Sequence, residues 1–344
     1  MDASGWPLTA LVAAFGVAAG LIGVFGVIMT RAARDLAHRT GLGEALTGAV
    51  LIGGATSLSG ITTSVTAAWN GHAGLAVSNA LGGIAAQTAF LAVADIFYRR
   101  ANLEHAAASV ENLMMCVFLI ILLALQMIAF ALPEVAVLGV HPVTAVLIGV
   151  YLLGLSLLMR THESPMWLPK RTTDTRPEGS GQRSRIRLGL PSLWLTFAGC
   201  AGTVALAGWV LALVAVPLAA RTGLSESFVG GVFTAVATSL PELVIAVAAV
   251  RIGALTLAVG DIVGGNAFDT LFIAVSDIAY REGPIYAALA GAELLWLALT
   301  LLMTGVLLAG LLFRERHGVG NIGSESLLLL AIYAGGAGLV AATG

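Results

Sequence analysis

The chain has 344 residues, of which 58% are hydrophobic and only 10% are charged. Soluble globular domains carry about 25% charged residues, so this composition excludes a soluble domain and predicts an integral membrane protein. The formal net charge of −2 also excludes a basic surface of the kind that binds nucleic acid.

Ten apolar segments follow one another along the chain. The hydrocarbon core of a bilayer requires about 20 apolar residues per helix. Apolar runs between polar clusters predict ten transmembrane helices, at residues 8–30, 43–69, 73–97, 108–131, 136–159, 189–219, 226–250, 254–279, 285–312 and 323–342. No basic residues precede the first run, which predicts a retained span and not a cleaved signal peptide. The predicted fold is an all-α integral membrane protein.

A polar linker at residues 161–188 divides the chain into a first five-helix repeat, residues 1–160, and a second, residues 189–344. With ten spans, 15 of the 17 lysine and arginine residues fall on one side of the membrane. Because basic residues concentrate on the cytoplasmic side, we expect residues 160–188 to be cytoplasmic and both termini to lie outside. The membrane is expected to be the plasma (inner) membrane.

The two halves are copies of one sequence. A shift of 182 residues aligns residues 39–98 with 221–280 without gaps, and more than two fifths of these positions are identical. Each half has an odd number of predicted spans, so the second copy is expected to be inverted relative to the first. Inverted repeats are typical of secondary transporters. The alternative is a duplicated scaffold that transports nothing.

The seventh predicted span contains a polar segment, TSLPE, in mid-membrane. Pro241 has no N–H to donate, which frees a backbone carbonyl oxygen that is tolerated only where it lines a cavity or meets a ligand. Thr238 and Glu242 are four residues apart and share a helix face, with Ser239 at the same depth. An intramembrane glutamate indicates a functional site. The alternative is a protonated Glu242 that holds a structural hydrogen bond.

The eighth predicted span supplies a second acid, Asp269, inside an apolar run, with Asn266 one turn before it. Asp261 faces either the same cavity or a neighbouring helix, and the sequence leaves both open. Carboxylates, hydroxyls and freed carbonyls form an all-oxygen ligand set, which suits hard cations such as Ca²⁺, Mg²⁺ or Na⁺. Two carboxylates would neutralise one divalent ion.

The strings TSLPEL and GDIVGGNAFD resemble the repeats of the cation/Ca²⁺ antiporter superfamily, in particular its sodium/calcium exchanger branch. The resemblance implies alternating access, with Ca²⁺ exchanged for Na⁺ or H⁺. It also implies that ions bind between the second, third, seventh and eighth spans, while the first and sixth spans slide across them. By the family's pattern the matching ion ligands are Thr56, Ser57, Thr238, Ser239, Glu242 and Asp269.

The first copy departs from this pattern. Gly60 stands where the family has a second glutamate, and Gly83 and Gly265 stand where it has serines. Gln87 takes the position that Asp269 has in the second copy. The core acids therefore belong to the second copy, which predicts a lower Na⁺ stoichiometry or coupling to protons. The predicted ion-binding residues are Thr56, Ser57, Gln87, Thr238, Ser239, Glu242, Asn266 and Asp269, with helix breaks predicted at Gly60 and Pro241.

Glu111 and Glu293 occupy the same position in the two copies. They are either symmetric gating acids or acids at helix starts that interact with the helix dipole. With Asp261 they form the accessory set of candidate site residues.

The sequence thus predicts a secondary-active antiporter of a divalent cation, most directly Ca²⁺ against Na⁺ or H⁺. Alternatives are a transporter of Mg²⁺, Mn²⁺ or Na⁺ alone, and a non-transporting membrane scaffold or receptor. No serine or cysteine is paired in sequence with a base, so an enzyme is not expected. Cys116 and Cys200 lie in apolar runs without the spacing of a metal site, and no cofactor is expected. The expected partners are the lipid bilayer and small cations, without an obligate protein partner.

Overall fold

The computed structural model describes residues 3–40, 53–98, 101–163, 168–170, 172, 189–316, 318 and 322–343. These residues are mostly helical, and they contain no β-strand apart from an isolated bridge between Val137 and Val140. Residues 43–52 of the second predicted span, and most of the linker at 161–188, lie outside the described residues.

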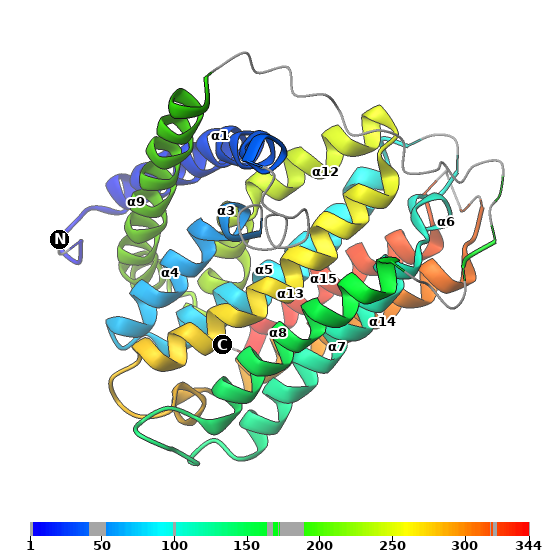
Figure 1. Ribbon diagram of the computed structural model, residues 1–344. Helices are drawn as coiled ribbons and strands as arrows, with labels where there is room; N and C mark the ends of the chain where they lie inside the picture. The colour runs from blue at the N-terminus through cyan, green and yellow to red at the C-terminus, as the bar shows by residue number, and fades with distance from the viewer. Residues whose placement is uncertain are drawn as a thin grey trace.

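The two halves contain matching series of helices (Figure 1). The first half comprises α1 (Leu8–Thr40), α3 (Gly53–Thr56), α4 (Leu58–Trp69), α5 (Ala73–Asp95), α6 (Leu103–Ala107), α7 (Val110–Ala131) and α8 (Pro142–Glu163). The second comprises α9 (Leu190–Thr222), α10 (Glu226–Phe228), the π-helical turn η2 (Val229–Thr234), α11 (Ala235–Thr238), α12 (Leu240–Ile252), α13 (Leu255–Ala279), the 3₁₀ turn η3 (Ile285–Ala288), α14 (Gly291–Phe313) and α15 (Ser324–Thr343).

Seven of the described helices are long and apolar enough to cross a membrane: α1, α5, α7, α9, α13, α14 and α15. An eighth span results if Glu226–Thr238 and Leu240–Ile252, which meet at a bend of 48°, are counted as one. The apolar part of α8, Pro142–Leu158, is shorter. The chain is therefore a multi-pass helical membrane protein. Each of the ten predicted segments contains a described helix, but the count of ten spans stays a prediction.

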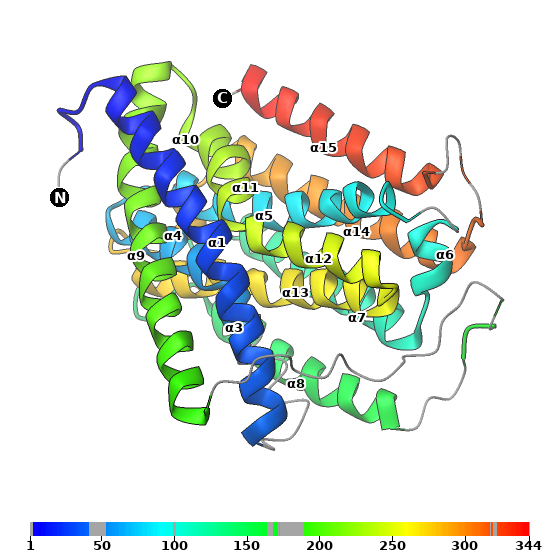
Figure 2. The ribbon, with the colours of Figure 1, turned by 90° about the horizontal axis from the view of Figure 1, so that it is seen from above.

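The helices α1 and α9 lie side by side in opposite directions, at the left of Figures 1 and 2. Arg221, near the end of α9, donates a hydrogen bond to the carbonyl oxygen of Ser4, just before α1, at 2.9 Å. At the other end of the pair, Leu36 of α1 packs against Leu193 of α9. The antiparallel direction is the one expected for two inverted copies of a single helix.

Each of these long helices packs on the other half of the chain, through an equivalent glycine. Gly26 of α1 contacts the ring of Pro241 in α12, and a Cβ atom at Gly208 of α9 would lie 2.7 Å from the carbonyl oxygen of Ser59 in α4. Glycine is needed at both positions because a side chain would separate the helices. Gly26 and Gly208 are 182 residues apart, as are Ser59 and Pro241, so the two contacts are related by the repeat.

Two aspartates at the ends of α5 and α13 join the halves in the same reciprocal way. Asp95 accepts hydrogen bonds from the backbone N–H groups of Leu103 at 2.7 Å and Gly323 at 2.9 Å. Asp277 accepts them from Ile285 and His141, both at 2.8 Å. Each aspartate thus satisfies a backbone donor in its own half and one that precedes the last helix of the other half.

Polar residues gather inside the molecule and apolar ones outside it. The central helix α5 is almost entirely buried and carries five buried polar side chains, those of Ser78, Asn79, Gln87, Thr88 and Asp95. On the surface, Leu195 is 74% exposed and Leu152 is 60% exposed. In water such a surface would be unfavourable, whereas in a bilayer it faces hydrocarbon.

Candidate functional site

Both copies interrupt a helix at an equivalent serine. Ser57 separates α3 from α4, and Ser239 separates α11 from α12, each with a backbone ψ angle near zero (−1° and 8°). Pro241 lies in the first turn of α12, where its missing N–H disrupts no helical hydrogen bond. The first copy has Ser59 at that position, so the interruption does not require proline. Neither predicted helix break falls on its predicted residue, because Gly60 lies inside α4 and Pro241 lies inside α12, three and two residues after the interrupting serines.

The interrupted helices enclose a small cavity together with α5 and α13. The space available to the centre of a water-sized sphere is about 10 Å³, which is close to what one water molecule requires. Seven of the eight predicted ion-binding residues line it. The lining residues are Thr56, Ser57, Gly60, Asn79, Gly83, Gln87, Thr238, Ser239, Glu242, Asp269 and Phe272.

The carboxylate of Asp269 is held by side chains of the opposite copy. Ser57 donates a hydrogen bond to Oδ1 at 2.6 Å, and the Nε2 atom of Gln87 donates one to Oδ2 at 2.7 Å. Gln87 also approaches the hydroxyl of Ser239 at 3.3 Å. These contacts fix the orientation of Asp269, which is 2% exposed, and draw the two halves together at the centre of the molecule.

Two oxygens of the lining residues are buried without a hydrogen-bond donor. Oε2 of Glu242 and Oε1 of Gln87 have no partner among the described residues, and Glu242 is only 7% exposed. Leaving a buried acceptor unsatisfied costs about 1–3 kcal/mol, so such atoms in a cavity are available to a ligand. None of the described residues that line the cavity carries a positive charge, which fits a cation as that ligand.

The oxygen atoms around the cavity belong to several kinds of side chain. Within the described part of the chain, no group of three or more His, Cys, Asp or Glu side chains is arranged to hold a metal ion. A cation in the cavity would therefore be bound by the two carboxylates together with hydroxyl and amide oxygens. Oxygen-only coordination of this kind is typical of hard cations.

Four lining residues were not predicted from the sequence as ligands: the glycines Gly60 and Gly83, and the side chains of Asn79 and Phe272. Asn79 donates hydrogen bonds to the carbonyl oxygen of Gly60 at 3.2 Å and to the hydroxyl of Ser64 at 2.9 Å, and it accepts one from Thr234 at 2.7 Å. Its alignment with Asp261 was the available signal. Nothing in the sequence indicated that Phe272 would line the cavity, because a phenylalanine in an apolar helix resembles any other packing residue.

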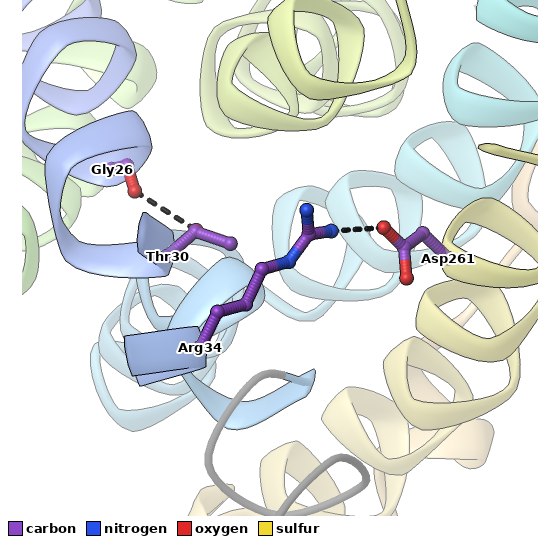
Figure 3. Close-up of polar contacts among 4 residues, drawn as sticks. All are labelled: Gly26, Thr30, Arg34 and Asp261. Atoms are coloured by element: carbon purple, nitrogen blue, oxygen red, sulfur yellow. Dashed lines mark hydrogen bonds and ion pairs between the residues drawn. The ribbon is translucent and has the colours of Figure 1, made fainter. Parts of the chain in front are cut away.

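The remaining candidates lie away from the cavity. Asn266, the eighth predicted ion-binding residue, does not line it, and its side chain donates a hydrogen bond to the hydroxyl of Thr88 at 3.0 Å. Asp261 forms an ion pair with Arg34 of α1 (Figure 3). Of the two alternatives for Asp261, the structure therefore favours the neighbouring helix.

The two symmetric glutamates occupy the first turns of α7 and α14. Glu293 accepts a hydrogen bond from the backbone N–H of Ala290 at 2.9 Å and contacts the hydroxyls of Ser78, at 3.3 Å, and Ser227. This capping arrangement fits the helix-start alternative for Glu293, and Glu111 occupies the corresponding helix start.

The comparison of the whole chain with known protein families agrees with the two-half organisation. Residues 10–160 and 191–340 both match the sodium/calcium exchanger protein family. The chain belongs to this family. The predicted resemblance is confirmed, and the two matched segments coincide with the two halves of the exchanger-family fold. No curated protein matches the chain significantly.

Three solved structures illustrate the shared fold. The chain is 13% identical to an H⁺/Ca²⁺ exchanger, CAX, with a TM-score of 0.69 over 96% of this chain and 85% of that one. It is 19% identical to native YfkE, with a TM-score of 0.64 over 98% and 93% of the two chains. It is 18% identical to the sodium-calcium exchanger NCX_Mj, with a TM-score of 0.58 over 95% and 97%. At these identities the likeness shows the fold alone.

Proposed function

We propose that the protein is a secondary-active antiporter that exchanges a divalent cation, with Ca²⁺ as the first candidate, for Na⁺ or H⁺ by alternating access. The observation that carries the proposal is the convergence of seven predicted ligands from both halves on one small buried cavity with two carboxylates. The similar solved structures include one named as an H⁺/Ca²⁺ exchanger and one named as a sodium-calcium exchanger. Both names support Ca²⁺ as the first candidate, and together they keep H⁺ and Na⁺ as the two candidate coupling ions.

Charge balance supports a divalent substrate. Two ionised carboxylates in a low-dielectric interior require compensation, and one divalent cation supplies it. Glu242 carries the central role in this proposal because its Oε2 atom is buried and unpaired among the described residues. Asp269, Gln87 and the hydroxyls of Ser57 and Ser239 complete the proposed ligand set, and Thr56 and Thr238 add hydroxyls or backbone carbonyls.

The proposed topology has ten spans in two inverted five-helix repeats. We place both termini outside, residues 160–188 in the cytoplasm, and the protein in the plasma (inner) membrane. The antiparallel packing of α1 and α9 supports the inverted arrangement, and the distribution of lysine and arginine supports the orientation.

Ion flux into proteoliposomes tests this function directly. Purified protein should move ⁴⁵Ca²⁺ when either a Na⁺ gradient or a pH gradient is applied alone, and the gradient that drives uptake identifies the coupling ion. Parallel assays with Mg²⁺ and Mn²⁺ establish the substrate. If neither gradient drives any of these ions, the protein is not an antiporter, and the non-transporting scaffold becomes the better account.

The variant Glu242→Gln should lower Ca²⁺ flux at least a hundredfold, because it removes one of the two charges that bind the ion. Glu134→Gln is the matched control, since it changes the same side chain at an exposed position between α7 and α8. Unchanged flux in Glu242→Gln, with correctly folded protein, would remove Glu242 from the ion site.

A further inference from the structure

One aromatic side chain stands among the polar residues of the proposed ion cavity. Phe272 lies on α13, one turn after Asp269, and is 3% exposed. Among the described residues that line the cavity, it is the one with a purely hydrocarbon side chain. A hydrocarbon ring offers no oxygen to a hard cation, so its presence at this place requires an explanation other than coordination.

The ring lies directly over Gly60. A Cβ atom at position 60 would come within 2.5 Å of Cε2 and 3.1 Å of Cζ of Phe272. Nonbonded carbon atoms pack at about 3.5–4.0 Å, so no side chain can be added at Gly60 while the ring keeps this position. Gly60 is the counterpart of Glu242 in the repeat. The ring therefore covers the place from which a first-copy glutamate would project.

The two copies do not differ in the phenylalanine itself. Phe90 occupies the position in the first copy that Phe272 has in the second. Phe90 is buried in α5 but does not line the cavity. The difference lies at the partner position, where the second copy has Glu242 and the first has a glycine that leaves room for the Phe272 ring.

Space and charge then limit what the cavity can hold. About 10 Å³ is available to the centre of a water-sized sphere, which corresponds to roughly one water molecule. Two carboxylates, Glu242 and Asp269, neutralise one divalent ion, and the place of a third carboxylate is covered by a ring. A second divalent cation would find neither room nor compensating charge, and a second monovalent cation would find charge but no room.

We propose that Phe272 is a specificity-determining residue: it occupies the place of the absent first-copy glutamate and limits the site to one cation at a time. This inference rests on the proposed antiport function. It predicts that a coupling ion and the divalent ion cannot be bound together, and that they compete for a single place.

The test measures equilibrium ⁴⁵Ca²⁺ binding to the purified full chain and its inhibition by Na⁺ and Ba²⁺. The wild-type protein should bind one Ca²⁺, and any inhibition by Na⁺ should have a Hill coefficient of about one. Gly60→Glu should weaken Ca²⁺ binding at least tenfold, because the new side chain meets the ring. The double variant Gly60→Glu/Phe272→Ala should recover Ca²⁺ binding and raise the Hill coefficient for Na⁺ to about two.

Phe272→Ala alone should admit larger ions, with inhibition by Ba²⁺ improved at least tenfold relative to the wild type. Phe272→Leu should change Ba²⁺ inhibition in the same direction by a smaller factor. It replaces the alanine variant in this test if Phe272→Ala does not fold. Phe90→Ala is the matched control, because it removes the equivalent ring outside the cavity and should leave ion competition unchanged.

The outcomes separate the two proposals. If the wild-type protein neither binds nor transports Ca²⁺ or another divalent ion, the antiport function fails and this inference fails with it. If the wild type binds a divalent ion but Na⁺ inhibits with a Hill coefficient of two, the limit of one cation is wrong while the antiport function stands. If folded Phe272 variants show unchanged inhibition by Ba²⁺, the role of Phe272 is likewise wrong while the antiport function stands.

Discussion

Position by position, the two copies keep their structural acids and differ in the acids of the cavity. Asp95 and Asp277 correspond in the repeat and accept equivalent pairs of backbone hydrogen bonds. Gly60 and Glu242 also correspond, but only the second copy carries a carboxylate. Backbone donors at a fixed place in the fold require an acceptor in both copies. Under the proposed function, the number of carboxylates in the cavity depends instead on the ions to be bound.

A further acid, Glu104, lies outside the predicted spans, on the short helix α6. Burial, together with the neighbouring Asp95 carboxylate, raises the pKa of Glu104 from its ordinary value of 4.5 to about 7. The hydroxyl of Ser326 donates a hydrogen bond to Oε1 at 2.9 Å, while Oε2 has no partner among the described residues. The native state therefore favours the protonated form.

This raised pKa gives a pH-dependent stability. Because the folded pKa of Glu104 exceeds the unfolded one, the contribution of the protonated form is fully present below pH 4.5 and is lost as the pH rises through about 7. Glu104→Gln is neutral at every pH. We expect its melting temperature to match the wild type at pH 4.5 and to exceed it by roughly 3 °C or more at pH 8.5. Thermal unfolding in detergent across this range measures the difference, and a difference that does not change with pH would contradict the assignment.

Among the elements, the interrupted helices and the long helices that cross them position the cavity. The breaks at Ser57 and Ser239 place polar backbone and side chains at its wall, and Gly26 and Gly208 let α1 and α9 lie close to the segments beyond those breaks. The ion pair between Arg34 of α1 and Asp261 of α13 is a further polar link between a long helix and the core (Figure 3). It constrains any sliding of α1.

Removing this ion pair should loosen α1. The side chains of Arg34 and Asp261 are 32% and 28% exposed, so each depends on the other for charge compensation. Arg34→Gln and Asp261→Asn should each lower the stability, and the double variant should lower it by less than their sum, with a coupling energy of about 1 kcal/mol. A double-mutant cycle of thermal unfolding measures this energy.

Arg31→Gln is the control for this cycle, since Arg31 is exposed and lies three residues earlier on α1. It should show no coupling to Asp261→Asn. Strictly additive effects of Arg34→Gln and Asp261→Asn would show that the contact does not hold α1 to α13.

At the scale of the whole molecule, the halves are interlocked and not merely adjacent. The last helix of the first half, α8, packs on α7 and on α13 of the second half, and α15 packs on α14 and on α5 of the first. The reciprocal hydrogen bonds of Asp95 and Asp277 secure these contacts. These reciprocal contacts relate the two copies by an approximate twofold rotation, and the antiparallel direction of α1 and α9 fits the proposed inverted orientation.

The orientation can be tested by cysteine labelling in cells, on a background with Cys116→Ser and Cys200→Ser. With ten spans, Glu134→Cys between α7 and α8 should react with a membrane-impermeant maleimide in intact cells. Ser184→Cys in the linker should react only after the membrane is permeabilised. The reverse pattern would invert the proposed topology, and labelling of both positions in intact cells would contradict the span count.

The sequence alone determined the class of protein, the duplication and the acids of the candidate site. Each of these depends on local or periodic features: too few charges for a water-facing surface, identical residues 182 positions apart, and the acids Glu242 and Asp269 within apolar runs. A charge in such a run is unfavourable unless it is compensated, whatever the details of packing. The position of an intramembrane acid is therefore informative before any contact is known.

Only the tertiary structure decided which of these groups meet. Ser57 and Asp269, which share a 2.6 Å hydrogen bond, are 212 residues apart, and no periodicity along the chain predicts such a pair. The same holds for Asp261, which pairs with Arg34 outside the cavity, and for Phe272, whose ring covers Gly60. These contacts depend on how closely helices from two halves cross, and that distance is set by packing and not by the properties of any single segment.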